Sequence, residues 1–176
     1  VKRVNIVQDK DSFKRNLNLY LVSENQNGDL ITTPTTLKNN LKTWIINYKM
    51  INDTIDILDG KIVNLSIQYE IMIDREENRF SALSQANTAL SARFSRNKFE
   101  FGEPFNYSDI FQVLKNIDSV LDVGEVRVVQ QTGAAYSDVG FNVDKYISPD
   151  GRTIMAPENY IFEIKSPSED IVGSII

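Results

Sequence analysis

The chain has 176 residues, of which 41% are hydrophobic and 10% aromatic, and this is enough for one domain with its own core. It contains no cysteine and no histidine, which excludes disulfides, thiolate metal sites and catalysis by a thiol or an imidazole. The net charge of −5 disfavours nucleic acid as the main partner, because nucleic-acid interfaces are normally basic. The apolar runs are too short to predict a membrane-spanning helix. This composition favours a protein that is not an enzyme.

The first fifty residues predict an arm, a strand and a helix. Residues 1–16 carry scattered charges without a period, which indicates an N-terminal lead-in or arm. Alternating leucines over residues 17–22 predict a strand. Thr33 followed by Pro34 predicts a helix start, because proline suits the first helical position. This helix presents an apolar stripe, expected in the core, of Leu37, Leu41, Trp44, Ile45 and Tyr48.

The middle of the chain carries the clearest strand pattern. Apolar side chains alternate with largely polar ones from Val63 to Ile73, which predicts a long strand with one buried and one solvent-facing side. Residues 54–57 alternate in the same way. Asp59-Gly60 between the two segments predicts a hairpin, and the register of the apolar residues favours a three-residue loop over 59–61.

Two more helices and a strand complete the predicted core. A helix is expected over about 78–96, and a shorter one begins after Asn106 as N-cap. The inner face of the longer helix is expected to consist of Phe80, Leu83, Ala86, Leu90 and Phe94. A last strand covers 123–130. This order predicts an α+β fold over residues 17–132, with a ferredoxin-like split βαβ core in which helices cover one face of a four-stranded antiparallel sheet.

Residues 133–176 predict a C-terminal β-hairpin arm and an apolar tail. The hairpin would enclose the turn Ser148-Pro149-Asp150-Gly151. Nothing in the predicted core covers the apolar side chains of this segment, and uncovered apolar arms are a common means of packing against neighbouring subunits. We therefore expect assembly, with subunit contacts made by Tyr146, Ile154, Tyr160, Phe162, Ile171, Ile175 and Ile176.

Two other functions stay open at this stage. A carboxylate-dependent hydrolase would draw a pair of side chains from Glu70, Glu76, Glu77 and Glu100, and would need them roughly 5–10 Å apart beside a cleft. A ferredoxin-like nucleic-acid-binding module would need aromatic side chains on its open sheet face. That face is expected to offer no stacking platform, because it would show Asn64, Ser66, Gln68, Glu70, Glu125 and Arg127.

Several segments carry a family resemblance: LYLVSE at 19–24, TLKNNLKTW at 36–44, YKMINDTIDI at 48–57, FGEPF at 101–105, IFEIK at 161–165 and DIVG at 170–173. They resemble the C-terminal region of the baseplate wedge protein of T-even-type contractile-tailed phages, in the broader baseplate-J-like group. The resemblance extends over most of the chain from about Leu17 onward. The family's chains are much longer, so the start at Val1 is expected to reflect a C-terminal piece.

The resemblance implies a structural protein of the virion, located in the phage tail baseplate and assembled in the cytoplasm of the host bacterium. Such a protein self-associates, as a homodimer within a larger ring, and joins other wedge proteins around the tail hub. The ring rearranges when the tail contracts. The resemblance implies no enzymatic activity and no cofactor or metal. No nucleic-acid, membrane or small-molecule partner is expected.

Overall fold

The computed structural model describes residues 1–9, 16–74, 76, 78–94 and 99–176. The helices are α1 (Thr35–Ile46), α2 (Arg79–Phe94), α3 (Tyr107–Lys115), α4 (Val143–Tyr146) and α5 (Pro167–Asp170). The strands are β1 (Arg3–Gln8), β2 (Asn16–Glu24), β3 (Leu30–Thr32), β4 (Thr54–Asp59), β5 (Lys61–Ile73), β6 (Phe105–Asn106), β7 (Val120–Gln131), β8 (Thr153–Ile154), β9 (Tyr160–Glu163) and β10 (Ile171–Ile175). The predicted α+β class is confirmed.

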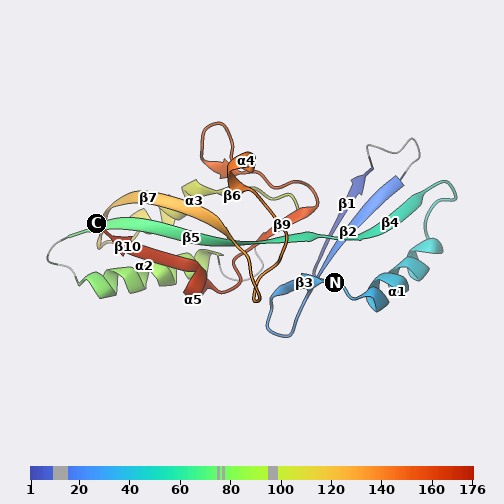
Figure 1. Cartoon of the computed structure of the whole chain (residues 1–176), viewed down its shortest axis with the longest axis horizontal. Coiled ribbons are helices and arrows are strands. Elements are labelled where there is room, and N and C mark those ends of the chain that lie inside the picture. Colours follow the sequence, from blue (N-terminus) through green and yellow to red (C-terminus); the bar gives the residue numbers. More distant parts are fainter. Residues whose placement is uncertain (10–15, 75, 77, 95–98) are drawn as a thin grey trace.

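The strands form two larger sheets that lie side by side along the molecule (Figure 1). Sheet A contains β1, β2, β3 and β4, and sheet B contains β5, β7, β9 and β10. Both are mixed, because β4 pairs with β2 in parallel, as do β9 and β10 with β5. The strands that were expected to share one antiparallel sheet are therefore divided between sheets A and B.

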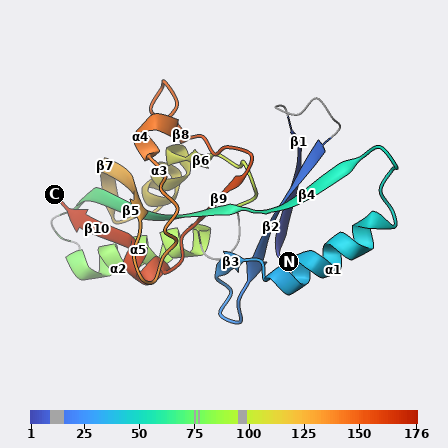
Figure 2. The same ribbon diagram turned by 45° about the vertical axis from the view of Figure 1, so that its right-hand side comes forward.

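One nearly continuous extended segment, β4 followed by β5, connects the two sheets (Figures 1 and 2). The hairpin predicted at Asp59-Gly60 is wrong, because the Gly60 N–H donates to the Leu21 carbonyl at 2.9 Å and the Lys61 N–H donates to the Asn159 carbonyl at 2.9 Å. A Cβ on Gly60 would lie 2.4 Å from the Phe101 ring. Glycine at this position permits the close approach of an aromatic ring and does not form a turn.

The core of sheet B follows the predicted pattern. The alternating side chains from Val63 to Ile73 are all buried, with at most 9% exposure. They pack against buried residues of α2 and α3, including Ala86, Leu90 and Ile110. Phe80 was expected on the same inner face but is 85% exposed. It precedes the buried Ala82 by two residues, about 200° around the helix, and so points to solvent.

The two chain ends belong to the sheets. Residues 3–8 do not form an arm, because β1 pairs with β2 along its whole length. The predicted C-terminal hairpin arm is also wrong, because β9 and β10 each add to β5 as a parallel strand. The predicted turn at 148–151 is present, with the Gly151 N–H donating to the Ser148 carbonyl at 2.8 Å. The bounds 1–16, 17–132 and 133–176 stay a prediction, although strands pair across both of them.

A small second core joins sheet A to sheet B. Its buried members are Val22, Leu30, Ile62 and Ile161, with Phe99 and Phe101 packed against them. Beside this junction core lies Glu163, which is only 8% exposed. Its carboxylate accepts hydrogen bonds from the Leu30 N–H at 2.7 Å and from Asn64 Nδ2 at 2.8 Å. One buried carboxylate thus connects β3 to β5.

Glu163 is expected to make the stability of the chain depend on pH. Burial is the largest influence on the pKa of Glu163 and raises it. The hydrogen bonds from Leu30 and Asn64 lower this pKa, the nearby charge of Asp29 raises it, and Lys165 lowers it. The net effect is a raised pKa. The folded chain then binds the proton more tightly than the unfolded chain, so the contribution of Glu163 to stability declines as pH rises above the usual glutamate range. We expect the wild type to lose stability relative to Glu163→Gln as pH rises above about 4, the usual glutamate pKa, measured by urea unfolding. The expectation would be contradicted if the stability difference between the wild type and Glu163→Gln were independent of pH. It would also be contradicted if the wild type gained stability relative to the variant as pH rises.

Candidate interaction surface

Helix α1 lies on the surface of the molecule. It has no buried residue, and Trp44 and Tyr48, which were expected in the core, are 59% and 70% exposed. The helix begins at Thr35, after Pro34, and not at Thr33. Thr33 is instead buried and accepts a hydrogen bond from the Ser23 hydroxyl at 3.0 Å. The apolar stripe of this helix is therefore free of a covering layer over much of its length.

An open apolar groove of about 370 Å³ lies between α1 and strand β1. We call it the α1 groove. Its floor includes Leu17 and Leu19 of β2, and Val4 and Ile6 of β1 form one wall. The other wall comes from α1 and the residues after it, namely Leu41, Trp44, Ile45, Tyr48 and Lys49. Figure 2 shows α1 running alongside sheet A, with β1 and β2 beside it.

Strand pairing explains why this face of sheet A is apolar. Val4 lies opposite Leu21, Ile6 lies opposite Leu19, and Leu19 in turn lies opposite Ile57 of β4. Residues opposite one another in a sheet share a face, so the row of Ile6, Leu19 and Ile57 is apolar across three strands. Leu19 and Leu21 are buried, whereas Val4 and Ile6 on the edge strand are 52% and 61% exposed. The residues that bury Leu19 and Leu21 therefore do not extend over the neighbouring strand β1.

The helical wall of the groove is well ordered by its own contacts. The rings of Trp44, in α1, and Tyr48, just after it, have centroids 4.5 Å from each other. Lys49 is the charged residue among those that line the groove, and its Nζ donates to the Asp53 carbonyl at 2.6 Å. Large exposed apolar patches mark interaction sites in soluble proteins. This arrangement is suited to binding a protein surface.

The residues predicted as C-terminal contacts have a different setting. Ile154, Phe162 and Ile171 are at most 2% exposed and belong to the core of sheet B. Three others, Tyr146, Tyr160 and Ile175, are partly buried against that core. Ile176 alone of the predicted set is strongly exposed, at 59%. The expectation that this segment is uncovered was wrong, because β9 and β10 complete the sheet of their own chain.

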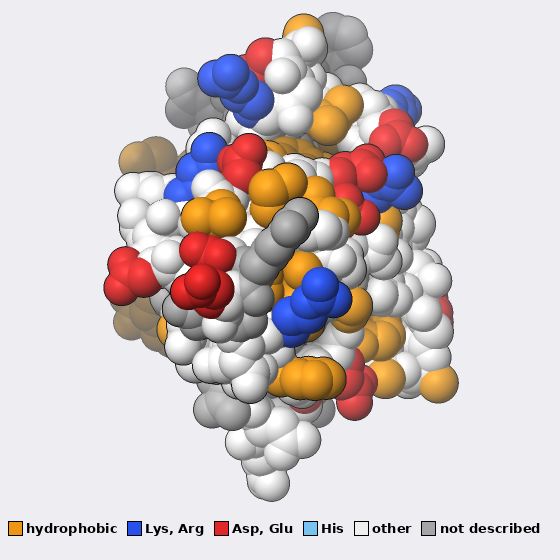
Figure 3. Space-filling model, turned by 90° about the vertical axis from the view of Figure 1, so that its left-hand side faces the viewer, with side chains coloured by type: hydrophobic (Ala, Val, Ile, Leu, Met, Phe, Trp, Pro, Cys, Tyr) orange, Lys and Arg blue, Asp and Glu red, His pale blue; other side chains and the backbone are white. Residues whose placement is uncertain are grey.

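The end of the molecule that holds the C-terminus also exposes apolar side chains. Figure 3 shows them scattered over that face among charged groups. The exposed residues of β5, β7 and β10 near this end include Met72, Leu121 and Val172, which are 45%, 62% and 54% exposed. These three side chains do not line the α1 groove and belong to a separate surface.

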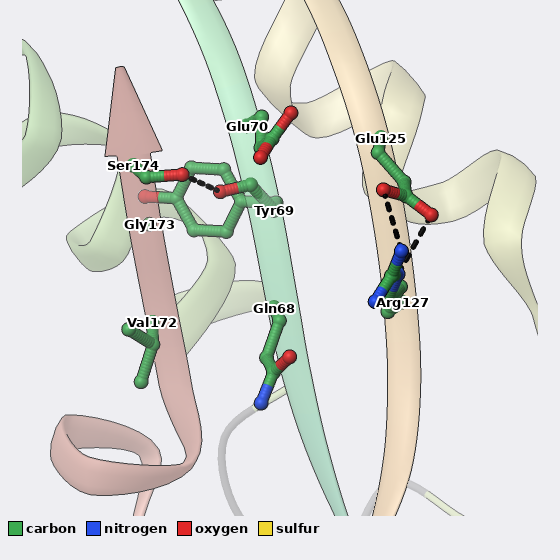
Figure 4. A pocket seen from close by; sticks show the side chains of 8 residues that line it. All are labelled: Gln68, Tyr69, Glu70, Glu125, Arg127, Val172, Gly173 and Ser174. Atoms are coloured by element: carbon green, nitrogen blue, oxygen red, sulfur yellow. Dashed lines mark hydrogen bonds and ion pairs between the residues drawn. The ribbon is translucent and has the colours of Figure 1, made fainter. Parts of the chain in front are cut away.

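A shallow polar pocket of about 280 Å³ lies on the outer face of sheet B (Figure 4). As predicted, Glu70, Glu125 and Arg127 lie on this face, and Glu125 accepts two hydrogen bonds from the Arg127 guanidinium at 2.6 and 3.0 Å. Asn64 and Ser66 were expected to be solvent-facing but are buried, because the C-terminal residues cover them. The Ser66 hydroxyl donates to the Asp170 carbonyl at 2.7 Å.

The described carboxylates proposed for a hydrolase have different surroundings. Glu70 lines the polar pocket, together with Glu125, which was not among the predicted carboxylates. Glu100 forms an ion pair with Arg3 of sheet A at 2.9 Å, and Glu76 is exposed. Glu77 lies outside the described residues. Over the described part of the chain, no group of three or more Asp and Glu residues has a metal-binding arrangement, and no helix has the length and apolar content to cross a membrane.

Comparison with known proteins gives a likeness in structure but not in sequence. No protein-family model and no curated protein matches the chain. The fold is similar to that of a chain in the cryo-EM structure of the anti-feeding prophage baseplate, symmetrised six-fold, with a TM-score of 0.54 over 86% of this chain. The two sequences are 10% identical, and the match spans 29% of that chain. At this identity the likeness shows a shared fold.

Proposed function

We propose that this chain is a structural component of a contractile-tail baseplate, the C-terminal part of a wedge subunit. In this proposal the subunit self-associates and joins neighbouring wedge proteins into the ring around the tail hub, which rearranges on contraction. It is assembled in the cytoplasm of the host bacterium and becomes part of the virion. The chain contributes binding surfaces and performs no catalysis.

The observation that carries the proposal is the shared fold with a baseplate chain over 86% of the present chain. The segments that resemble the wedge family give a second line of support, because that resemblance rests on the sequence alone. The exposed apolar surface adds a physical reason for assembly, since α1 has no buried residue and the side chains of Trp44 and Tyr48 lie open to solvent.

Two separate surfaces are available for the proposed contacts. The α1 groove lies beside sheet A, and the C-terminal end carries Ile176 and Val172. Of the residues predicted as contacts, we retain Ile176 for the junction with a neighbouring wedge protein, because its side chain is accessible. Having two faces on one subunit permits each copy to contact two neighbours, as closure of a ring requires.

Mass spectrometry of purified tails tests the proposal directly. Tails are isolated from the phage or prophage that encodes the chain and separated into baseplate and tube fractions. We expect peptides from residues 1–176 in the baseplate fraction, in amounts comparable with other ring proteins. A protein that is abundant in the lysate but absent from purified particles would contradict the proposal.

A further inference from the structure

We infer that the α1 groove is the seat of self-association, and that its occupant is a second copy of this chain. Two copies related by a two-fold axis would each insert the apolar side chains that follow α1 into the groove of the other. We call these side chains, Met50 and Ile51, the knob. The inference rests on the self-association in the proposed function and specifies which surface performs it.

The knob lies beside the groove in sequence and is held in place. It directly follows Tyr48 and Lys49, which line the groove. Met50 is 72% exposed and Ile51 is 96% exposed. The local backbone is fixed by a hydrogen bond from the Asp53 N–H to the Met50 carbonyl at 3.1 Å. The knob and the α1 groove are therefore neighbouring apolar features of the same chain, and each could contact its counterpart on a second copy.

The exposed area matches what a stable dimer needs. The side chains that would be covered are between 52% and 96% exposed, and they are Val4, Ile6, Trp44, Tyr48, Met50 and Ile51. Together they present on the order of 800 Å² of surface, similar to the roughly 800 Å² that each partner contributes to a standard-size interface. A two-fold contact uses the same patch on both copies, so a second copy covers the patch without any additional segment.

Lys49 is the charged side chain that lines the groove, and its Nζ donates to the Asp53 carbonyl of its own chain at 2.6 Å. The contact offered to a second copy is therefore mainly apolar.

Disulfide trapping tests this inference, because the chain has no cysteine of its own. Ile6→Cys in the groove wall and Ile51→Cys in the knob are prepared as separate single variants and mixed under mild oxidation. Both positions are more than 60% exposed, so the fold tolerates the changes. Since each molecule carries one thiol, a disulfide between positions 6 and 51 forms only between copies. Phe80→Cys, at 85% exposure on α2, is the matched control.

We expect the mixed disulfide between the variants at positions 6 and 51 to form at least tenfold faster than the one between the variants at positions 80 and 51. Sedimentation equilibrium of the wild-type chain is expected to show a dimer that Ile51→Asp weakens at least tenfold and Phe80→Asp leaves unchanged. Equal trapping rates, or a wild-type chain that stays monomeric, would overturn the inference. A monomer whose peptides are nevertheless present in purified baseplates would overturn the groove contact and leave the baseplate function standing. A dimer that is trapped through positions 6 and 51, in a protein that is absent from baseplates, would support the groove contact and overturn the baseplate function.

Discussion

Replacing Gly60 by alanine is expected to lower the free energy of unfolding by about 3 kcal/mol, at the upper end of the usual cost of overpacking. The added Cβ would lie 2.4 Å from two atoms of the Phe101 ring and 2.7 Å from Val22 Cγ2. Both neighbours belong to or pack against the junction core between the sheets. They cannot move apart without disturbing the passage from β4 into β5. Urea unfolding followed by circular dichroism measures the loss.

Gly140→Ala is the matched control for this change. A Cβ at Gly140 would meet no atom within 4 Å. Its substitution is expected to change stability by less than about 0.5 kcal/mol. If the two variants were equally stable, the close contact between Gly60 and Phe101 would not exist, and the passage between the sheets would have to be different.

Truncating Phe162 to alanine is expected to cost about 3–5 kcal/mol in the isolated chain, as for other buried aromatic side chains. The Phe162 side chain is 1% exposed, and its ring centroid lies 5.5 Å from that of Phe141 and 6.4 Å from that of Phe99. These contacts are all within one chain. If Phe162 served only as a subunit contact, Phe162→Ala would weaken assembly and leave the stability of the monomer unchanged.

The exposed aromatic Phe80 provides the control for this experiment. Phe80→Ala removes the same atoms from a side chain that is 85% exposed, so stability is expected to change by no more than about 0.5 kcal/mol. Thermal and urea unfolding of both variants, performed at equal and low concentration, separate folding from association. A Phe162→Ala chain as stable as the wild type would show that β9 does not complete the core of sheet B.

The elements of sheet B were largely predictable from the sequence. The alternation from Val63 to Ile73 identified which face of β5 is buried, and the apolar spacing in α2 and α3 located both helices. Alternation states which side of a strand is apolar but not which strand lies next to it. The parallel pairs of β5 join residues about a hundred positions apart, such as Lys61 and Tyr160. No local pattern carries that information, so the C-terminal segment was mistaken for an uncovered arm.

The same ambiguity explains the error at Gly60. Asp-Gly between two alternating segments is the usual mark of a hairpin. Glycine is equally required where a ring packs directly on the backbone, and here Phe101 does so. The aromatic partner is some forty residues away in sequence, so its presence could not be predicted from the local pattern. Reading Gly60 as a turn led to the wrong expectation that β4 and β5 pair in one sheet.

The α1 groove could be predicted only in part. The apolar stripe that includes Leu41, Trp44 and Tyr48 was identified, but an amphipathic stripe has the same spacing whether its own domain or a partner covers it. The other wall was missed, because Val4 and Ile6 are two apolar residues in a segment of scattered charge. Their pairing with Leu21 and Leu19 aligns them with a buried face. Val4 and Ile6 therefore cannot be recognised as part of an apolar surface until the pairing of β1 with β2 is known.

Cryo-EM of the assembled baseplate, with the full-length protein in place, tests the proposed role most directly. The proposal predicts that sheets A and B fit as one unit into density repeated in a ring around the tail hub. It further predicts that Ile51 of one copy lies in the α1 groove of another. A ring that lacks density for this fold, or a tail that assembles normally when residues 1–176 are deleted, would contradict it.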